Sequence, residues 1–220
     1  MSKLGFKFGS TPRNPNLKDW ISVVGNYDET KLSNLFNEAI RNTINFTDTL
    51  YSKWYKKAKS NNLDTYSTVS YLDYKTYIHG DILTKVDIAS MMNSLEVRTP
   101  LIDVEIINLM AKIPTKHKIS RNYDGTWQKK KILNTIASKR FGKKFTERKK
   151  QGFNAPIEDW FTDKTNFGTQ INSIIKSKQS KIYEFLNFEE VNKIFEDSTA
   201  INFNRKYQFF VLEMWLKVNI

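Results

Sequence analysis

The sequence predicts a mainly α-helical protein, and three observations lead to this fold class. Apolar residues recur at intervals of three and four positions along most of the chain, which is the period of an amphipathic helix. Only one short segment shows the two-residue alternation of a strand, and no repeat of fixed length is visible. A chain of 220 residues with 40% hydrophobic residues can bury one core without cross-links.

The order of the expected elements follows from the same spacing. The first 16 residues are polar, with glycines and two prolines, and predict an extended segment ahead of a domain spanning residues 17–220. Short helices are also expected after Ile157. The main helices are marked by apolar positions over residues 32–40, 46–55, 71–78, 82–92, 106–110, 127–136 and 207–218.

Local signals set the expected boundaries of these helices. Gly80 is expected to close the third helix, because glycine is common just past a helix end, and Asp81 is expected to cap the fourth. Asp103 is expected to cap the fifth helix, which Pro114 ends. Residues 95–98 alternate between apolar and charged side chains, so an extended segment is predicted there.

The positive charge of the chain is concentrated in one segment. The formal net charge is +12, and residues 112–150 hold 14 of the 35 lysines and arginines but only two acids, Asp124 and Glu147. Outside that segment acids and bases are equal in number. Such a block indicates an anionic partner: a nucleic acid, an anionic lipid or a phosphate-bearing small molecule. A solvated basic surface is the alternative.

Composition excludes several classes of function. The chain has no cysteine, so disulfides, thiolate nucleophiles and cysteine-based zinc sites are excluded. His79 and His117 are too few and too isolated for a metal cluster, and no metal ligand is predicted among the residues of this sequence. No apolar run approaches the roughly 20 residues of a membrane span, and no signal-peptide pattern is seen at the N-terminus. A cytoplasmic location is expected.

Three stretches hold residues that suit a chemical site. Residues 81–103 read DILTKVDIASMMNSLEVRTPLID, residues 130–133 read KKIL, and residues 148–156 read RKKQGFNAP. The eight glycines stand singly, and neither GxGxxG nor GxxxxGK followed by serine or threonine occurs. The sequence therefore contains no phosphate-binding loop of those two kinds.

These stretches resemble motifs of the asparagine synthetase family, written DLLxKxDRxSMAxSLExRxPFLD, K-x-I/L-L-R and RPKxGFxxP, in the same order and at similar spacing. The resemblance implies a fold class: the helical C-terminal portion of an α/β adenine-nucleotide α-hydrolase-like (PP-loop ATP pyrophosphatase) domain, with the parallel sheet and its phosphate loop largely missing. The motif-bearing core is residues 81–160, and residues 17–80 fit the helical lead-in of the family more loosely.

The resemblance also implies a reaction. In this family of ligases ATP adenylates a carboxylate such as that of aspartate, pyrophosphate leaves, and ammonia attacks the acyl-adenylate. Lys150 matches the catalytic, phosphate-contacting lysine of RPKxGF, and Lys130 matches a lysine expected near the phosphates. Ammonium groups at these positions would stabilise the charge that builds on the leaving phosphates. Gly152 suits a turn that brings backbone close to the ATP or pyrophosphate. For both lysines, a solvated side chain is the alternative.

Five more residues of the first motif are expected to form a substrate site or its scaffold. Lys85 and Asp87 lie on an otherwise apolar helix and are expected at its rim or beside partners. Glu96 and Arg98, two positions apart on an extended segment, face the same way. These four residues either contact the substrate or form ion pairs that position a loop. Asp103 is explained fully as a helix N-cap.

The sequence also departs from the family pattern. Ile88 and Asn134 stand where arginine is usual, and Lys149 stands where proline is usual. The SGGxDS loop, the magnesium-binding GEGxDE stretch and the glutaminase domain with its cysteine nucleophile are not found. A truncated or split synthetase is therefore expected, in which most residues that bind ATP and Mg²⁺ lie elsewhere. Both a separately encoded N-terminal half and a gene fragment remain open.

Two other functions remain as alternatives. A non-catalytic binding or assembly module would expose apolar area and self-associate. A nucleic-acid-binding protein would use the basic segment, but no nucleic-acid-binding motif is present, so this function is disfavoured. The choice of carboxylate substrate does not follow from the sequence.

Overall fold

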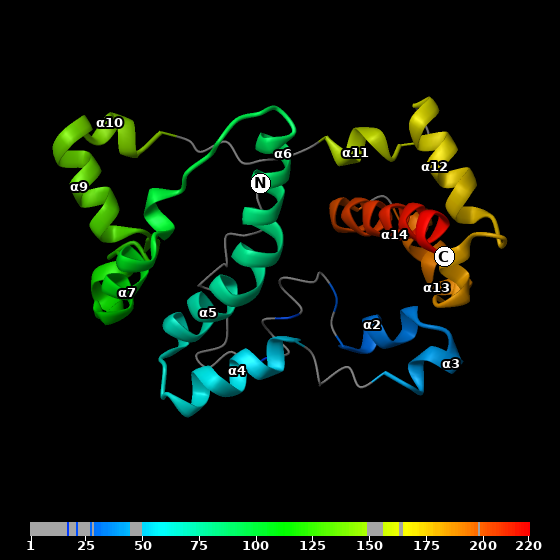
Figure 1. Ribbon diagram of the computed structural model, residues 1–220, viewed down its shortest axis with the longest axis horizontal. Coiled ribbons are helices and arrows are strands. Elements are labelled where there is room, and N and C mark those ends of the chain that lie inside the picture. The colour runs from blue at the N-terminus through cyan, green and yellow to red at the C-terminus, as the bar shows by residue number, and fades with distance from the viewer. Residues whose placement is uncertain are drawn as a thin grey trace. The chain divides into compact units, whose positions relative to one another are not determined.

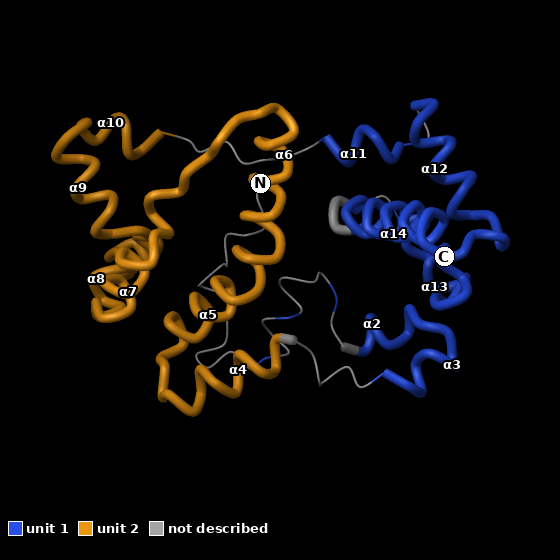
Figure 2. Tube along the Cα trace, in the orientation of Figure 1, with its two compact units in different colours: residues 1–6, 16–49, 152–220 blue, residues 7–15, 50–151 orange. Residues whose placement is uncertain are grey.

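The computed structural model describes residues 17, 21, 27, 29–44, 50–148, 156–162, 165–197 and 199–220. These residues form two compact units (Figure 2). Unit 1 comprises the described residues of 17–44 and 156–220, and unit 2 comprises residues 50–148. The predicted motif-bearing core, residues 81–160, therefore has members in both units. The predicted extended segment 1–16 lies outside the described residues.

Unit 1 is helical and is built around its last helix. Its elements are α2 (Glu29–Leu35), α3 (Glu38–Arg41), α11 (Ile157–Trp160), α12 (Asn166–Lys176), the 3₁₀ helix η3 (Lys181–Glu184), α13 (Phe188–Glu196) and α14 (Ala200–Asn219). Helix α14 packs against α11, α12, α13 and η3 (Figure 1). The predicted aromatic helix at the C-terminus is confirmed, and it begins seven residues before the predicted start at Tyr207.

The core of unit 1 is a cluster of aliphatic and aromatic side chains. Phe161 is 2% exposed, and its ring lies 6.2 Å from the rings of Tyr207 and of Phe210 on α14, edge to face. Burial on this scale is the main stabilising term of a small fold. The cluster consists of Tyr27, Leu35, Phe161, Ile171, Ile175, Ile182, Leu186, Val191, Phe195, Phe203, Phe209 and Leu216.

A buried carboxylate sits within unit 1. Glu213 on α14 is fully buried, accepts a hydrogen bond from the Ile182 N–H at 2.9 Å, and pairs with Lys217 at 3.1 Å. The Ile182 amide belongs to the first turn of η3, where N–H groups have no partner within the helix. Glu213 therefore attaches η3 to α14 by satisfying one of these amides.

The expected helix through residues 32–40 is interrupted, which corrects the prediction. An isolated antiparallel bridge joins Phe36 to Leu186, with Asn37 N–H donating to the Phe185 carbonyl at 2.9 Å. The Asn37 side chain then caps α3 by accepting from Ile40 N–H at 3.0 Å. The backbone of residues 36–37 pairs with a distant segment, so it cannot continue the helix.

Unit 2 contains the remaining helices and one short sheet. Its helices are α4 (Leu50–Ser60), α5 (Thr65–Asp73), the π-helix η1 (Tyr74–Leu83), α6 (Thr84–Met91), the 3₁₀ helix η2 (Pro100–Ile102), α7 (Val104–Lys112), α8 (Thr115–Lys118), α9 (Lys131–Phe141) and α10 (Lys143–Thr146). Strands β1 (Ser120–Arg121) and β2 (Trp127–Gln128) pair antiparallel. A mainly helical protein is thus confirmed for the described residues, and none of their helices is long and apolar enough to cross a membrane.

The prediction that Gly80 ends a helix and Asp81 begins the next is wrong. Elements α5, η1 and α6 follow one another without a break from Thr65 to Met91, and both residues lie within the π-helix. Glycine is tolerated inside a helix, at a loss of about 0.5–1 kcal/mol relative to alanine. Thr84 Oγ1 donates to the His79 carbonyl at 3.0 Å, next to Gly80.

The helix predicted over residues 127–136 is also corrected. Trp127 and Gln128 belong to β2, opposite Arg121 and Ser120, and α9 begins only at Lys131. The turn of this hairpin holds Gly125 at φ 81°, and an aspartate followed by glycine is a common turn signal. The predicted helix therefore starts four residues too early.

Candidate functional site

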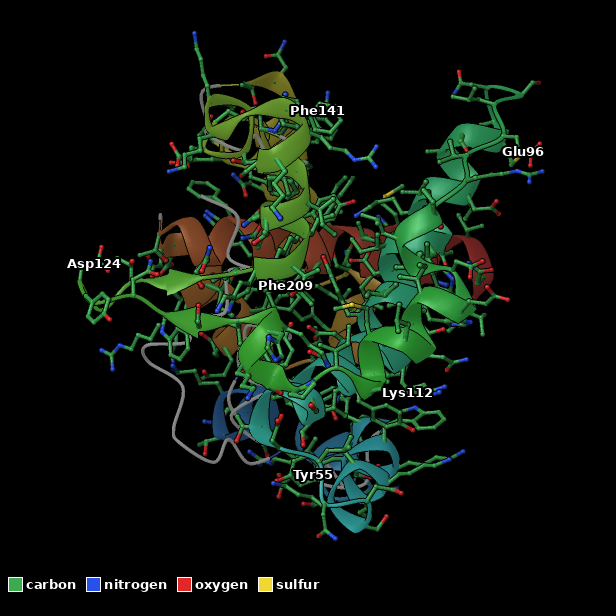
Figure 3. All side chains as sticks on the ribbon, turned by 90° about the vertical axis from the view of Figure 1, so that its left-hand side faces the viewer. Tyr55, Glu96, Lys112, Asp124, Phe141 and Phe209 are labelled. Atoms are coloured by element: carbon green, nitrogen blue, oxygen red, sulfur yellow. The ribbon has the colours of Figure 1, made fainter. Side chains whose placement is uncertain are left out.

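Glu96 and Arg98 form a salt bridge with each other on the surface of unit 2. Arg98 Nε lies 2.8 Å from Glu96 Oε1. The side chain of Glu96 is 71% exposed and that of Arg98 is 85% exposed. Figure 3 shows Glu96 at the tip that follows α6. The segment 95–99 is not helical, as predicted, but it forms no strand with the described residues. Neither side chain forms a hydrogen bond or salt bridge with another loop of the described chain. The predicted ion-pair scaffold therefore consists of the Glu96–Arg98 pair alone.

Lys85 and Asp87 lie at the exposed rim of the long helical run, as expected. Lys85 Nζ lies 3.5 Å from Asp81 Oδ1, one helical turn earlier, and both side chains are about half exposed. Asp87 is exposed about one turn before the end of this helical run at Met91. No hydrogen bond or salt bridge of the described residues joins Lys85 or Asp87 to the Glu96–Arg98 pair.

Asp103 is a helix N-cap, and this prediction is confirmed. Its carboxylate accepts a hydrogen bond from Glu105 N–H at 2.8 Å at the start of α7. A cap of this type contributes about 1 kcal/mol to helix stability. Its position in the first motif is explained without a contact to a substrate.

Lys130 occupies a special backbone position directly before α9. Its φ of 54° lies in the left-handed region, which is uncommon for a residue with a side chain. Asn134 holds this turn closed: its N–H donates to the Lys130 carbonyl and its side-chain amide donates to the Lys129 carbonyl, both at 2.8 Å. The asparagine that replaces the family's arginine therefore supports the conformation of Lys130.

Lys150 and Gly152 lie outside the described residues, as does Lys149. Their predicted roles stay predictions.

Helices α9 and α10 carry a basic surface with unneutralised charge. Six cations on and beside these helices form no salt bridge with any described residue: Lys130, Lys131, Lys139, Arg140, Lys143 and Lys144. Asp124 lies at the tip of the hairpin, where hydrogen bonds from Thr126 lower its pKa, and Phe141 marks the end of α9 (Figure 3). The charge excess is visible in the sequence, but the packing of α10 against α9, which displays it, is not.

Exposed aromatic rings accompany this surface. The Phe141 and Phe145 rings are 5.2 Å apart, and the Arg148 guanidinium lies 4.5 Å from the centre of the Phe145 ring. Cation–π contacts of this kind contribute about 0.5–1 kcal/mol at exposed sites.

Among the described residues, the largest pKa shifts belong to the core of unit 1 and not to these cations. Burial raises the pKa of Tyr27 to about 12, although the Arg205 charge opposes the shift. Burial and the Glu213 charge raise the pKa of Tyr183 to about 12. Both shifts follow from packing against the core, so they do not mark a catalytic acid or base.

The sequence of the chain matches a known protein family. The sequence profile described as asparagine synthase matches residues 12–218. The chain belongs to the asparagine synthase family. The resemblance found in residues 81–103, 130–133 and 148–156 is thereby confirmed at the level of the family.

Curated relatives of this asparagine synthase family member include glutamine-hydrolysing asparagine synthetase 1 of Bacillus subtilis (strain 168). It is 29% identical over 165 residues, which cover 74% of this chain and 25% of the relative. Proteins of Mycobacterium bovis and Mycobacterium tuberculosis, provisionally named glutamine-hydrolysing asparagine synthetases, are each 32% identical over 103 residues, or 47% of this chain and 15% of the relative. The chain thus spans a quarter or less of the relatives it matches. No solved structure matches it significantly.

Proposed function

We propose that this chain contributes part of the synthetase site of an asparagine-synthetase-type ligase. In the proposed reaction, a carboxylate oxygen of aspartate or a similar acid attacks the α-phosphorus of ATP, and the bond to pyrophosphate breaks. The nitrogen of ammonia then attacks the acyl carbon, and AMP leaves with the electron pair of the C–O bond. The family match over residues 12–218 carries this proposal. The absence of cysteine suits a reaction in the cytoplasm.

The lysines are assigned to the leaving phosphates. Lys150 is the proposed catalytic cation, Lys130 a second cation, and Gly152 a close backbone approach to the nucleotide. The left-handed conformation at Lys130 directs the chain into α9 and leaves its ammonium without a salt bridge to the described residues. A cation that has no anionic partner can respond fully to the charge that develops on pyrophosphate.

Arg98 is assigned to the carboxylate substrate. Glu96 accepts from Arg98 Nε, which fixes one edge of the guanidinium and leaves the two terminal nitrogens without a described partner. Those nitrogens present parallel N–H groups that match a carboxylate in a bidentate pair. Glu96 is therefore a positioning residue in this proposal, and Lys85, Asp87 and Asp103 shape the helices on either side.

The site requires groups that this sequence does not contain. No SGGxDS or GEGxDE stretch occurs in it, so we propose that the residues binding most of ATP and Mg²⁺ come from other polypeptide, whether continuous with this sequence or separately encoded. A glutaminase domain supplying ammonia would likewise come from that polypeptide. On this basis the 220 residues alone should form no asparagine from aspartate, ATP and ammonia.

The test is a graft into a relative that matches the chain. The aligned segment of the Bacillus subtilis protein is replaced by this chain, and aspartate-dependent AMP release is measured with ammonia as the nitrogen donor. We expect the graft to form AMP and asparagine in equal amounts. Lys150→Ala should lower the rate of AMP release at least about a hundredfold, which is the size of effect typical of one transition-state contact.

The matched control is Lys56→Met, which removes an equal charge from the exposed face of α4 and should leave the rate within twofold. A folded graft that binds ATP but releases no AMP would contradict the proposal. So would a Lys150→Ala graft with the rate of the unaltered graft.

A second candidate function rests on exposed apolar side chains. Met92, Leu101 and Val104 are 82%, 63% and 66% exposed, and Met91, Leu95 and Leu109 are each more than half exposed. Large exposed apolar area on a protein often marks an interaction surface. A non-catalytic assembly module would therefore self-associate, and sedimentation as a monomer at high concentration would count against it.

A further inference from the structure

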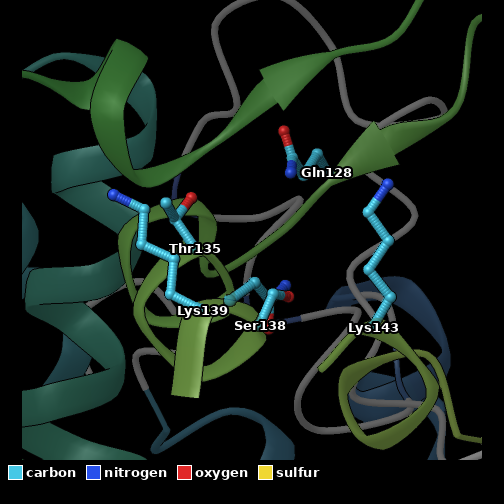
Figure 4. A pocket seen from close by; sticks show the side chains of 6 residues that line it. Gln128, Thr135, Ser138, Lys139 and Lys143 are labelled. Atoms are coloured by element: carbon cyan, nitrogen blue, oxygen red, sulfur yellow. The ribbon is translucent and has the colours of Figure 1, made fainter. Parts of the chain in front are cut away.

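Unit 2 contains a polar pocket between β2, α9 and α10, and Asn134 alone of its described lining residues occupies a position of the family motifs. It has a volume of about 370 Å³ and is lined by Gln128, Asn134, Thr135, Ser138, Lys139 and Lys143 (Figure 4). The four residues of α9 share one face of that helix, because they are spaced by one, three and four positions. Gln128 comes from β2 and Lys143 from α10, so the hairpin and both helices are needed to form the pocket.

Hydrogen bonds around the pocket fix the direction of its donors. Ser120 Oγ donates to Gln128 Oε1 at 3.2 Å, which leaves the Gln128 amide nitrogen as a free donor. Figure 4 shows that nitrogen on the side of the carboxamide nearer α9. Ser138 Oγ pairs with Thr146 Oγ1 at 2.9 Å, a contact that holds α10 against α9 and so places Lys143.

The charge of the pocket is wholly positive. Neither Lys139 nor Lys143 forms a salt bridge with the described part of the chain, and none of the described lining residues is acidic. Lys143 extends along the pocket toward the level of Gln128, whereas Lys139 lines it with its aliphatic stem while its ammonium reaches away (Figure 4). Lys143 is therefore the ammonium group of the pocket itself, and Lys139 adds a positive charge beside it.

We propose that this pocket binds a phosphate group, either as inorganic phosphate or as the phosphate of a small organic monoester. A phosphate carries nearly two negative charges and three or four acceptor oxygens, which match the Lys143 ammonium and the Gln128 N–H₂ as donors and the added positive charge of Lys139 beside the pocket. The volume exceeds that of one phosphate, so it accommodates an attached organic group or several waters. The pocket does not depend on the ligase reaction, and phosphate binding would persist in a chain with no synthetase role.

The experiment is a titration of the ¹⁵N-labelled chain with inorganic phosphate at constant ionic strength, followed by NMR. We expect saturable shifts of the Gln128 side-chain amide and of backbone amides of α9, with half-saturation at roughly 1–10 mM for a few solvent-accessible charge-assisted hydrogen bonds. Lys143→Met should weaken binding about tenfold. Lys139→Met should weaken it by about threefold, because its ammonium extends out of the pocket.

Gln128→Glu is the sharpest variant. The side chain keeps its shape and an oxygen that accepts from Ser120, but a carboxylate replaces the N–H₂ donor. Saturable binding should disappear while the dispersion of the spectrum is unchanged, which separates loss of binding from loss of fold. Lys56→Met, an equal loss of charge in the same unit, should leave the affinity within twofold.

Two outcomes would overturn the proposal. Shifts that rise linearly without saturation, or a Lys56→Met variant weakened as much as Lys143→Met, would show charge screening instead of a site. Glycerol phosphate and pyrophosphate form separate arms of the titration. Tighter binding of glycerol phosphate than of inorganic phosphate identifies an organic monoester as the ligand, and equal binding identifies inorganic phosphate. If inorganic phosphate, glycerol phosphate and pyrophosphate all fail to bind, the proposed site is contradicted.

Discussion

In unit 1 four elements, α11, α12, α13 and η3, pack against α14 around a buried apolar core. In unit 2 the segment from Ile88 to Leu109 leaves most of its apolar side chains exposed. Phe161, Ile175 and Ile182 are at most 2% exposed in unit 1. The first family motif, residues 81–103, runs through unit 2, and none of its residues is buried. The residues that identify the family are thus separate from those that stabilise unit 1.

The two units also differ in how they treat charge. In unit 1, Glu213 is fully buried and pairs with Lys217, and Glu190 pairs with Lys193 at 2.6 Å. In unit 2, the cations of α9 and α10 have no acidic partner among the described residues. Cations that repel one another lower the stability of the fold slightly and attract anions. The cations of α9 and α10 are therefore better explained by binding of an anion than by a contribution to folding.

The largest expected effect is a cavity in the core of unit 1. Phe161→Ala should lower the free energy of unfolding by about 3–5 kcal/mol, because it removes a ring packed against Tyr207 and Phe210. Leu109→Ala, at a site 55% exposed in unit 2, should change it by less than about 1 kcal/mol. Urea denaturation of the two variants measures both values. Equal losses would remove the contrast between the units.

Two glycines test the packing of each unit in opposite directions. A Cβ added at Gly168 in α12 would lie 1.9 Å from the Thr162 carbonyl oxygen, so Gly168→Ala should destabilise by about 1–3 kcal/mol. A Cβ at Gly80 meets nothing within 4 Å, so Gly80→Ala in η1 should stabilise by about 0.4–1 kcal/mol. Thermal melts of both variants give the signs. A stabilising Gly168→Ala would show that α12 is packed less tightly.

Alkaline pH should weaken unit 1 more than unit 2. The pKa of Tyr27 is raised to about 12 by burial, so the folded state keeps a proton that the unfolded state loses near pH 10. Stability from this group is present below pH 10 and declines as the pH rises toward 12, by about 1–2 kcal/mol. Tyr27→Phe should flatten the decline, measured by urea denaturation between pH 9 and 11.5. Tyr123→Phe, at a fully exposed phenol in unit 2, should leave the decline unchanged.

The smallest stability effect is expected at the exposed Glu96–Arg98 pair. Arg98→Ala should change the free energy of unfolding by less than about 0.5 kcal/mol, because an exposed salt bridge contributes little. In the grafted enzyme the same change should raise the KM for aspartate at least tenfold, if the terminal nitrogens of Arg98 bind its carboxylate. Urea denaturation and steady-state kinetics of one variant give both numbers. A large stability loss with an unchanged KM would make Arg98 structural.

Local signals predicted those parts of the fold that depend on neighbouring residues. The Asp103 cap was predictable because its acceptor and donor lie two positions apart. The non-helical segment before Pro100 and the aromatic C-terminal helix also follow from local spacing. The Gly80 boundary failed because a glycine signal is weak compared with the hydrogen bonds of a continuing helix.

The rest depends on contacts between distant residues, which no local pattern encodes. The Phe36–Leu186 bridge joins the two ends of unit 1 across 150 positions, so the division into two units could not be read from the sequence. The Asp124–Gly125 turn could have been recognised, and it would have moved the start of α9. Gln128 and Lys143 meet only because a hairpin and two helices pack together, whereas the motifs alone indicated Lys130 and Arg98.

Hydrogen exchange of the chain with and without phosphate tests the separation of stability from binding most directly. We predict that amides of α12, α13 and α14 exchange slowest and are unaffected by phosphate. Amides of α9 and α10 should slow about tenfold at a phosphate concentration ten times the dissociation constant. Equal protection of both units without ligand, or slowing spread evenly over both units with it, would contradict the account.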